Sequence, residues 1–489
     1  MKDDKLFELL NDIDESEIEK AEKYTGKSKP GKIVIFTALA SAAVILALAV
    51  GISVMQQNTP VTQENTTLST QGTSGGMRVI RAVNAPSDYE NMDVDEFFIA
   101  ENRRNWVDEY VSNTYASADL QKDMSGYYQS IMENTLISDT ANTVCSPVNM
   151  YIAFSMLAEI SDGNTRQQIL DVLDVTDIDN LRSNVSSIWD ANYVDTPVVT
   201  SLLANSMWLN ESVNFNDEPL NTLANDYHAS SYIGDVSSPE MSEELRKWIS
   251  ENTKGLLDQY AKDISLDPQS VIALVSTIYY KAGWVKKFHE NMNTQDIFHG
   301  TLSDSEVTMM HGGGSMPVYL GENFTSLGLS LSDSGSMYFL LPDEGVDVNT
   351  LPSDPEIFNA ISKNINMDEH WAKPYVYLTL PKFNVSEDIS LIDAMISLGI
   401  TDVLNPAVSD FSNLSPDSEG FAIGKAEHAA MVEVDEDGVI GAAYTFFDVR
   451  DGGGPIIENE LYFTLDRPFM FIVTGYDGSI LFSGIIRNL

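Results

Sequence analysis

Apolar residues are distributed unevenly along this chain, and their spacing predicts several distinct elements. Residues 33–54 carry no charged side chain, and the run is close to the ~20 residues that a membrane-spanning helix needs. From about Ala118 onwards, apolar positions recur at the spacings of a globular domain. Residues 119–136 repeat them at helical intervals, and Ser146 with Pro147 predicts the start of a second, almost wholly apolar helix.

Runs of strand length follow these helices. Residues 271–284 and 336–342 are mostly apolar, as strands buried on both faces are, and a proline ends the second run. Residues 206–209 predict a further strand of a sheet.

Residues 433–455 begin as an acidic turn, become small and apolar, and end in glycines and a proline. A surface loop is normally polar, whereas alternate residues here form one uncharged face: Val439, Gly441, Ala443, Thr445, Phe447 and Val449. The other face is charged only at its far end: Ile440, Ala442, Tyr444, Phe446, Asp448 and Arg450. Gly438 supplies a backbone that can pivot without a Cβ clash. The pattern predicts a strand that could join a sheet, with an ordinary hairpin loop as the alternative.

The charges around residues 33–54 predict how the chain crosses the membrane. Four lysines precede the run (Lys23, Lys27, Lys29 and Lys32), whereas Glu64 is the one charge in the next twenty residues. Because lysine marks the cytoplasmic side, we expect a cytoplasmic tail (1–32), a transmembrane anchor (33–54), an extracellular linker and lead-in (55–117) and a globular domain (118–489).

The alternative for the same segment is a signal peptide. Ala47-Leu48-Ala49 fits the small-x-small cleavage rule, and cleavage after Ala49 would give a secreted protein. The long charged leader and the apolar residues beyond Ala49 favour an uncleaved anchor, which places the protein at the cell membrane with a single span.

Composition excludes several classes of function. The formal net charge is -45, with 28 basic against 73 acidic residues, so the chain lacks the basic footprint of a nucleic-acid-binding protein. Cys145 is the one cysteine, so no intrachain disulfide can form. The six histidines have no metal-binding spacing. A calcium-loop start at Glu433 fails because Tyr444 stands at its twelfth position, and we expect neither a metal nor a cofactor.

Within residues 433–455, one segment resembles the hinge and reactive-centre loop of the serpins, whose pattern is acidic-acidic-Gly-Thr-x-Ala-rich-Thr. The matching residues are Glu436, Asp437, Gly438, Gly441, Ala442, Ala443 and Thr445. Val439 departs from the pattern because the family usually has Thr or Ser there. Tyr444 departs because the family prefers a small residue.

Further segments resemble serpin motifs in the family's order, from near Ala118 to Leu489. They are residues 146–149, 163–165, 206–209, 247–255, 271–284, 336–343, 380–383, 398–400, 410–415, 466–471 and 478–484. The resemblance implies a single large α+β domain with three β-sheets and about nine helices, here preceded by one transmembrane helix. The chain is therefore identified as a member of the serpin family, of a membrane-anchored bacterial type.

The resemblance also assigns residues to two structural sites. Ser146 and His428 match the shutter, a buried polar cluster beneath the point where the main sheet of serpins parts. Asn149 and Ser276 stand where the family has Ser and Asn, so the two residue types look exchanged. Trp284 matches the breach tryptophan at the top of that sheet, where insertion begins.

The function implied by the resemblance is inhibition by a suicide-substrate mechanism, without enzymatic activity of the chain itself. A serine protease, or a cysteine protease in its place, cleaves the loop, and the freed arm inserts into the main sheet. The candidate scissile positions are Val449, Arg450 and Gly452, and we expect an elastase-like or subtilisin-like target.

Bulky residues in the loop leave a second function open. Val439, Tyr444, Phe446 and Phe447 would slow insertion, and slow insertion turns an inhibitor into a substrate. The alternative is therefore a non-inhibitory serpin that acts as a surface-tethered binding protein.

Overall fold

The structure is a computed structural model of the whole chain. It describes residues 77–81, 92, 94–98, 106, 120–262, 264–266, 270–362, 370–424, 426–439 and 459–489, which belong to the compact unit Thr67–Leu489. The tail and anchor expected at residues 1–32 and 33–54 lie outside the described residues. Among the residues that are described, no helix is both long enough and apolar enough to cross a bilayer.

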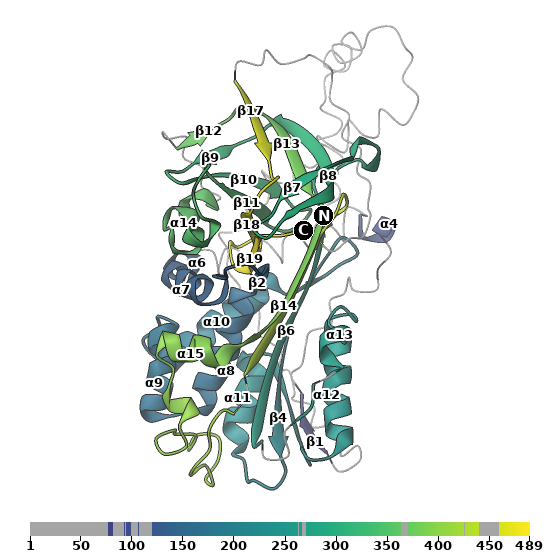
Figure 1. Cartoon of the computed structure of the whole chain (residues 1–489). Helices are drawn as coiled ribbons and strands as arrows, with labels where there is room; N and C mark the ends of the chain where they lie inside the picture. The colour runs from purple at the N-terminus through teal and green to yellow at the C-terminus, as the bar shows by residue number, and fades with distance from the viewer. Residues whose placement is uncertain are drawn as a thin grey trace, which may run out of the picture. The chain divides into compact units, whose positions relative to one another are not determined.

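The largest sheet, which we call the main sheet, runs through the lower half of Figure 1. Its strands, in spatial order, are β1 (Arg78–Ile80), β5 (Ala229–Gly234), β4 (Val199–Asn210), β6 (Ile272–Gly283), β16 (Gly438–Val439), β15 (Glu427–Val434) and β14 (Phe383–Ser390), and β3 (Val194–Asp195) pairs with β4. The β4–β5 pair is parallel and the other pairs are antiparallel.

Two further sheets complete the β-structure of the described residues. The second sheet consists of β12 (Trp371–Ala372), β9 (Val318–Leu320), β10 (Phe324–Ser330), β11 (Ser336–Pro342), β18 (Phe469–Thr474), β19 (Ile480–Ile486) and β2 (Thr143–Cys145). The third sheet consists of β17 (Glu460–Thr464), β13 (Tyr375–Pro381), β8 (Asp304–Ser315) and β7 (Thr294–His299).

The described helices are mostly short and lie between these strands in sequence. The α-helices are α4 (Val94–Phe97), α6 (Leu120–Asp123), α7 (Ser125–Thr135), α8 (Pro147–Ile160), α9 (Gly163–Val172), α10 (Ile178–Asn192), α11 (Asp217–Asp226), α12 (Pro239–Asn252), α13 (Asp258–Ala261), α14 (Glu356–Ala360) and α15 (Leu391–Leu398). The 3-10 helices are η1 (Glu290–Met292), η2 (Val348–Ser353) and η3 (Asp402–Leu404).

Helix α8 is buried along almost its whole length, as its apolar sequence predicts. The Ser146 hydroxyl accepts a hydrogen bond from the N–H of Asn149, and Pro147 occupies the first turn, so both predicted start signals are confirmed. The helix predicted over residues 119–136 is present but is interrupted at Met124, between α6 and α7.

The main sheet separates two hydrophobic cores, and the residues of β6 alternate between them. Leu274, Ile278 and Tyr280 face the larger core, which includes α8, whereas Ala273 and Val275 face a smaller core built with α12. In Figure 1, α12 and α13 lie on one side of the main sheet, and α8, α11 and α15 lie on the other. A strand added to this sheet would therefore bury both of its faces.

Part of the lead-in expected at residues 55–117 packs onto the domain. Strand β1 extends the main sheet beside β5, and Arg78 forms an ion pair with Asp217 at the start of α11. Phe97 and Trp106 are buried in the larger core with their rings 5.8 Å apart. The observed α+β architecture fits the expected three sheets and about nine helices, while the domain boundary at residue 118 stays a prediction.

Candidate functional site

Strand β16 enters the main sheet as a short wedge between β6 and β15. On β6, Gly438 pairs with Gly283 and Val439 pairs with Ala282. On the other side, Val439 pairs with Val434 of β15. The predicted hinge therefore already supplies the first two residues of a strand at this position.

Gly438 stands where two backbones approach too closely for a side chain. A Cβ atom at this residue would lie 2.2 Å from the carbonyl oxygen of Ala282 and 2.7 Å from the Cα of Gly283. Glycine is needed here because of that close approach, and a larger residue would push the wedge out of the sheet.

Below the wedge, the described residues of β6 and β15 are not paired with each other. On its other edge, β6 pairs with β4 from Ala282 to Ile272, and β15 pairs with β14 along its whole length. We call the opening between residues 272–281 of β6 and residues 427–433 of β15 the slot. Its two edges are backbone strands, each able to pair with a third strand.

A cavity of about 420 Å³ opens beside the slot on the face covered by α12. Its lining is mostly apolar and includes Leu245, Ile249, Ile264, Leu266, Val275 and Phe421. A second cavity of about 50 Å³ lies on the opposite face, next to α8. Ile272, Leu274 and Ser276 border both cavities, so the slot is hollow on each side of β6.

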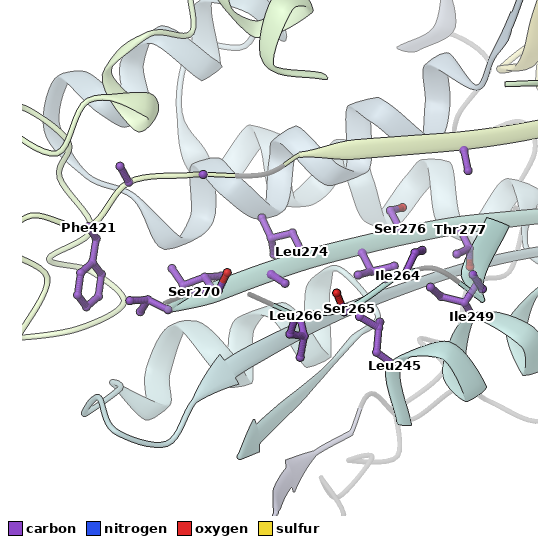
Figure 2. Close-up of a pocket in the computed structure, with 18 of the residues that line it drawn as sticks. Leu245, Ile249, Ile264, Ser265, Leu266, Ser270, Leu274, Ser276, Thr277 and Phe421 are labelled. Carbon is purple, nitrogen blue, oxygen red and sulfur yellow. The ribbon is translucent and has the colours of Figure 1, made fainter. Parts of the chain in front are cut away.

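The side chains around the slot confirm that β6 has two faces. In Figure 2, Leu274 and Ser276 lie on one side of β6, whereas Leu245 and Leu266 lie on the other. Phe421 lies at one end of the larger cavity, on the segment that precedes β15.

The acidic turn before the wedge is held by hydrogen bonds to its own backbone. The Asp435 carboxylate accepts from the N–H groups of Asp437, at 2.8 Å, and of Gly438, at 3.1 Å. Asp437 also forms a 2.8 Å ion pair with Lys287, which follows β6. This turn fixes the angle at which the wedge enters the sheet.

Glu436 is the most deeply buried acid of the turn, with an exposed fraction of 6%. Its carboxylate lies 2.7 Å from the Lys382 ammonium and accepts from the Asn293 amide. Burial opposes ionisation, but these two donors outweigh it and lower the pKa of the Glu436 carboxyl. The bond to Glu436 in turn raises the pKa of Lys382.

Trp284, the predicted breach residue, connects the acidic turn to the end of β6 through two hydrogen bonds. Its indole N–H donates to the carbonyl of Asp435 at 2.8 Å, and its backbone N–H donates to the carbonyl of Asp437 at 2.9 Å. The ring is 2% exposed and packs edge-on against Phe288 at 6.2 Å. The tryptophan therefore lies where the wedge begins, and its breach role stays a prediction.

The four predicted shutter residues meet beneath the slot. The N–H of Ser146 donates to Nε2 of His428 at 2.9 Å, which connects the start of α8 to β15. The Asn149 amide donates to the carbonyl of Ser276 at 3.1 Å, and the Ser276 hydroxyl donates to Oδ1 of Asn149. The two residues with apparently exchanged types are therefore within mutual reach, as the exchange hypothesis requires.

Asn205 is a further member of this cluster that the sequence did not single out. Its Oδ1 lies 2.7 Å from the Ser276 hydroxyl, as an alternative acceptor to Asn149, and its amide donates to the carbonyl of Tyr227. Asn205 is 2% exposed on β4. The signal that could have found it is an amide directly before the strand predicted over residues 206–209, because a buried amide needs partners.

His428 acts in this cluster as a neutral acceptor. Since Nε2 receives the Ser146 N–H, the ring proton resides on Nδ1. Burial lowers the pKa of His428 to about 4, so the ring is uncharged at neutral pH. The shutter is consequently a set of uncharged hydrogen bonds that joins α8 to both sides of the slot.

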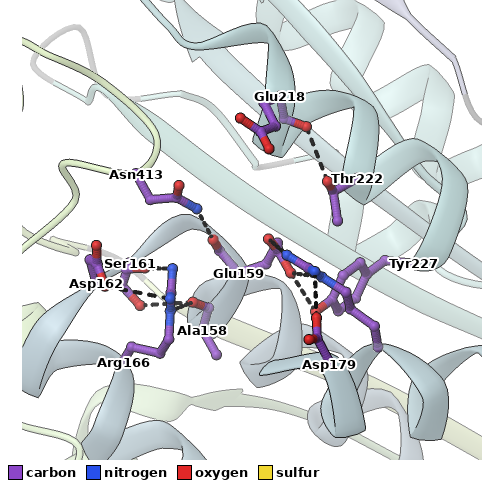
Figure 3. Close-up of polar contacts among 11 residues, drawn as sticks. Ala158, Glu159, Ser161, Asp162, Arg166, Asp179, Glu218, Thr222, Tyr227 and Asn413 are labelled. Atoms are coloured by element: carbon purple, nitrogen blue, oxygen red, sulfur yellow. Dashed lines mark hydrogen bonds and ion pairs between the residues drawn. The ribbon is translucent and has the colours of Figure 1, made fainter. Parts of the chain in front are cut away.

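A second polar cluster, which we call the Glu159 network, lies at the other end of α8 (Figure 3). Both oxygens of the buried Glu159 carboxylate accept from the Arg182 guanidinium at 2.8 Å, and the Tyr227 hydroxyl donates to the same carboxylate at 2.9 Å. The side chain of Asn413 donates to the backbone carbonyl of Glu159. This network joins α8 to α10 and to the end of α11.

The remaining candidate residues of the loop lie outside the described residues: Gly441, Ala442, Ala443, Thr445, Val449, Arg450 and Gly452. Their assignments stay predictions. Within the described part of the chain, no group of three or more His, Cys, Asp or Glu side chains could hold a metal ion. What the site offers chemically is two facing strand edges, a hinge between them and a neutral polar cluster below.

Comparison with known proteins agrees with this geometry. The family model described as Serpin (serine protease inhibitor) matches residues 126–489. The chain is similar to the leukocyte elastase inhibitor of Xenopus laevis, with 27% identity over 365 residues that cover 73% of this chain and 95% of that protein. It is also similar to Serpin-ZX of Arabidopsis thaliana, with 26% identity over 370 residues that cover 72% and 93% of the two chains.

The fold is shared with solved structures as well. The thermophilic serpin tengpin in its native state superimposes with a TM-score of 0.66 at 22% identity, covering 84% of this chain and 100% of that one. Proteins of the matched family are generally inhibitors of proteases rather than enzymes. This chain, through residues 126–489, belongs to the serpin family.

Proposed function

We propose that this chain inhibits a serine protease as a suicide substrate and that its loop inserts into the slot of the main sheet. The observation that carries the proposal is the open slot, with the hinge already paired at its upper end. The protease nucleophile would attack the scissile carbonyl, the amide bond would break, and the C-terminal segment would leave as the amine. The N-terminal arm, held to the protease as an ester, would then extend β16 downwards.

The pairing of β16 sets the register that such an arm would adopt. Each step forward along the loop is one step back along β6, because the two strands are antiparallel. Thr445 would come opposite Ser276, and from the β15 side it would come opposite His428. Ala443 would come opposite Ile278 in the same way.

This register sorts the loop residues onto the two faces of the sheet. Partners directly opposite in an antiparallel ladder share a face, so the uncharged set from Val439 to Val449 would face α8 and the larger core. The set that ends in Asp448 and Arg450 would face α12. The uncharged face would thus be the one that packs against the larger core, which fits the high free-energy cost of burying an unpaired charge.

The two cavities bear on the bulky residues of the loop. In the same register Tyr444 would come opposite Thr277 and Phe446 opposite Val275, beside the cavity of about 420 Å³. Phe447 would come opposite Leu274, beside the cavity of only about 50 Å³. Space is therefore ample for the first two side chains and tight for Phe447.

Insertion would be driven by new backbone hydrogen bonds and by burial of apolar surface. Each hydrogen bond contributes roughly 0.5–1.5 kcal/mol net, so a strand bonded on both edges over half of the slot would add about 5–10 kcal/mol. The intact protein would then be metastable and its lifetime kinetically controlled.

The test is to mix the chain with pancreatic elastase, subtilisin and trypsin and to look for a complex that resists denaturant. A covalent complex supports the proposal, and N-terminal sequencing of the released peptide locates the scissile bond. A cut outside residues 449–457 would reject the assigned position. Nicking the chain there should raise its thermal midpoint by about 10 °C or more. An unchanged thermal midpoint would rule out the insertion mechanism.

The tight fit of Phe447 favours one alternative, a non-inhibitory serpin that acts as a surface-tethered binding protein. If insertion is too slow, proteases will cleave the loop cleanly and no complex will accumulate. Phe447→Ala separates the two functions: it should convert a pure substrate into an inhibitor if the size of this side chain limits insertion. The matched change Phe446→Ala, beside the larger cavity, should have a smaller effect.

We also propose that residues 33–54 anchor the serpin domain on the outer side of the cell membrane, as in a membrane-anchored bacterial-type serpin. The proposal rests on their charge-free sequence and on the lysines that precede them. Detergent extraction of membranes from expressing cells, followed by N-terminal sequencing, distinguishes an intact anchor from a protein cleaved after Ala49 and released.

A further inference from the structure

Three tyrosine side chains form a cluster on the surface of the third sheet, and two of them, Tyr377 and Tyr462, form a stack. The rings of Tyr375 and Tyr377 lie 5.0 Å apart, and those of Tyr377 and Tyr462 lie 4.9 Å apart with an angle of 15° between their planes. Tyr377 pairs with Tyr462 in register between β13 and β17. Tyr462 is 71% exposed, more than any other large apolar side chain of the described residues.

A carboxylate lies beside this stack. The Tyr377 hydroxyl donates to Oε1 of Glu460 at 3.4 Å, and Glu460 is exposed at the start of β17. An exposed aromatic face next to a carboxylate suits a guanidinium group, which can stack on the ring and pair with the acid at once. A lysine ammonium would fit less well, because it cannot stack as a plane.

The stack is also close in sequence to the loop that a protease would attack. Strand β17 begins at Glu460, just after the residues that follow the hinge, and it lies beside β13 at the top of Figure 1. From Gly452 to Tyr462 the chain advances ten residues, so at most roughly 35 Å separates them. A protease that holds the loop covers about 800 Å² of its partner, and this short connection keeps the stack among the surfaces within its range.

We propose that Tyr377, Tyr462 and Glu460 form a docking surface for an arginine on the rim of the active-site cleft of the attacking protease. This proposal rests on the function proposed above, because it needs a protease engaged on the loop. The net charge of -45 would draw a basic protease toward the protein, and the stack with Glu460 would then hold one guanidinium in a defined position. Docking here would act on the rate of encounter rather than on the fate of the cleaved loop.

The test measures the second-order rate constant for attack on the loop by trypsin, pancreatic elastase and subtilisin. This constant includes both complex formation and simple cleavage, so it reports docking even if no inhibition occurs. With the protease that attacks fastest, Tyr462→Ala should lower the constant about threefold to tenfold. Glu460→Gln should lower it about twofold to threefold and weaken its dependence on salt.

Two controls separate docking from a general effect on the fold. Tyr462→Phe should keep the wild-type rate, because the ring face and not the hydroxyl receives the guanidinium. Tyr476→Ala, which removes a 41% exposed tyrosine outside the third sheet, should leave the rate unchanged. The ratio of complex to cleaved product should be the same in all variants.

The outcomes are distinct for the two proposals. Equal rates for Tyr462→Ala and the wild type would overturn the docking surface while leaving inhibition intact. Cleavage without any complex, but with the expected loss of rate in Tyr462→Ala, would overturn the inhibitor and keep the docking surface. An equal loss of rate in Tyr476→Ala would also overturn the docking surface, because the effect would then not be local.

Discussion

The two ends of helix α8 carry polar clusters of opposite character. At its start, the shutter consists of hydrogen bonds between uncharged groups. It contacts β4 and both border strands of the slot, β6 and β15. At its end, the Glu159 network is built on an ion pair whose carboxylate is buried, and it joins helices α8, α10 and α11. Its link to the sheet is the Tyr227 carbonyl, which accepts from Asn205 of β4, a strand that does not border the slot. We therefore expect the start of α8 to lose its hydrogen bonds to the sheet more readily than its end loses its contacts with α10 and α11.

The physical difference between the clusters is the cost of separating their members. A buried carboxylate that loses its counter-ion is left with an uncompensated charge, whereas neutral groups can exchange one hydrogen-bond partner for another at little net cost. The Ser276 hydroxyl illustrates this point, because Asn149 and Asn205 both offer it an acceptor. We expect substitutions at the two ends of α8 to affect the intact and the nicked protein differently.

The largest effect should come from Arg182→Met. The substitution leaves Glu159 buried without its cation, so the free energy of unfolding should fall by about 3–5 kcal/mol. Because the network does not contact the slot, the loss should be the same in the intact chain and in the chain nicked within residues 449–457. Urea denaturation of both forms measures it.

Asp179→Asn is the matched control for this change. Asp179 forms a 2.9 Å ion pair with the same guanidinium, but its side chain is 85% exposed, so we expect a loss of less than about 1 kcal/mol. A loss for Arg182→Met that differed strongly between the two forms would contradict the assignment of this end of α8 to the stationary part.

The next largest effect should be the response of the shutter to acid. The pKa of His428 is lowered to about 4, below the ordinary value of about 6.5. Between these two pH values the histidine is protonated in the unfolded chain and neutral in the folded chain. Stability should therefore be full above about pH 6.5 and fall by roughly 3 kcal/mol as the pH drops towards 4. Thermal midpoints across this range provide the measurement.

His228 must be separated from this response, because burial also lowers its pKa to about 4. His428→Gln and His228→Gln should each remove part of the acid dependence. Only the first should alter the difference between intact and nicked protein, since His228 stacks on Trp189 of α10 and precedes β5, which does not border the slot. If His428→Gln left the acid response unchanged, the assignment of His428 as a neutral histidine of the folded shutter would be wrong.

The sequence predicted the elements of this site better than it predicted their connections. Ser146, Asn149, Ser276 and His428 were identified by motif, and the structure brings them together because the apolar helix and the apolar strand around them must pack. The order of strands in the main sheet was not predicted from the sequence. Local periodicity cannot show it, since pairing partners lie far apart in the chain.

Other features were not visible in the sequence for a physical reason. The partners of Glu436 are Lys382 and Asn293, which are distant from it along the chain and carry no motif that would pair them with it. The strand β1 was missed because three residues are too few for a clear period. The exposed stack of Tyr377 and Tyr462 depends on the register of two strands, which spacing along one strand cannot supply.

A smaller effect should come from exchanging the two shutter residues. Asn149→Ser and Ser276→Asn should each lower the free energy of unfolding by about 1–3 kcal/mol, because each leaves a buried polar group without its partner. The double variant restores the arrangement that the family resemblance implies, and it should recover most of the loss. A double-mutant cycle of urea denaturation measures the coupling, and a coupling near zero would remove the exchange hypothesis.

The smallest effect on stability should come from Glu436→Gln at the hinge. The amide keeps the shape of the side chain but loses the charge that holds Lys382, so we expect a loss of about 1 kcal/mol from this partly exposed pair. The rate of insertion should change more clearly than the stability does. Without the Glu436–Lys382 pair, the turn would restrain the wedge less, and the loop would enter the slot faster. Asp437→Asn, whose carboxylate is 42% exposed, is the matched control and should change little. Time courses of thermal resistance after nicking would show a faster rise for Glu436→Gln than for Asp437→Asn, and equal rates would mean that the Glu436–Lys382 pair does not restrain the hinge.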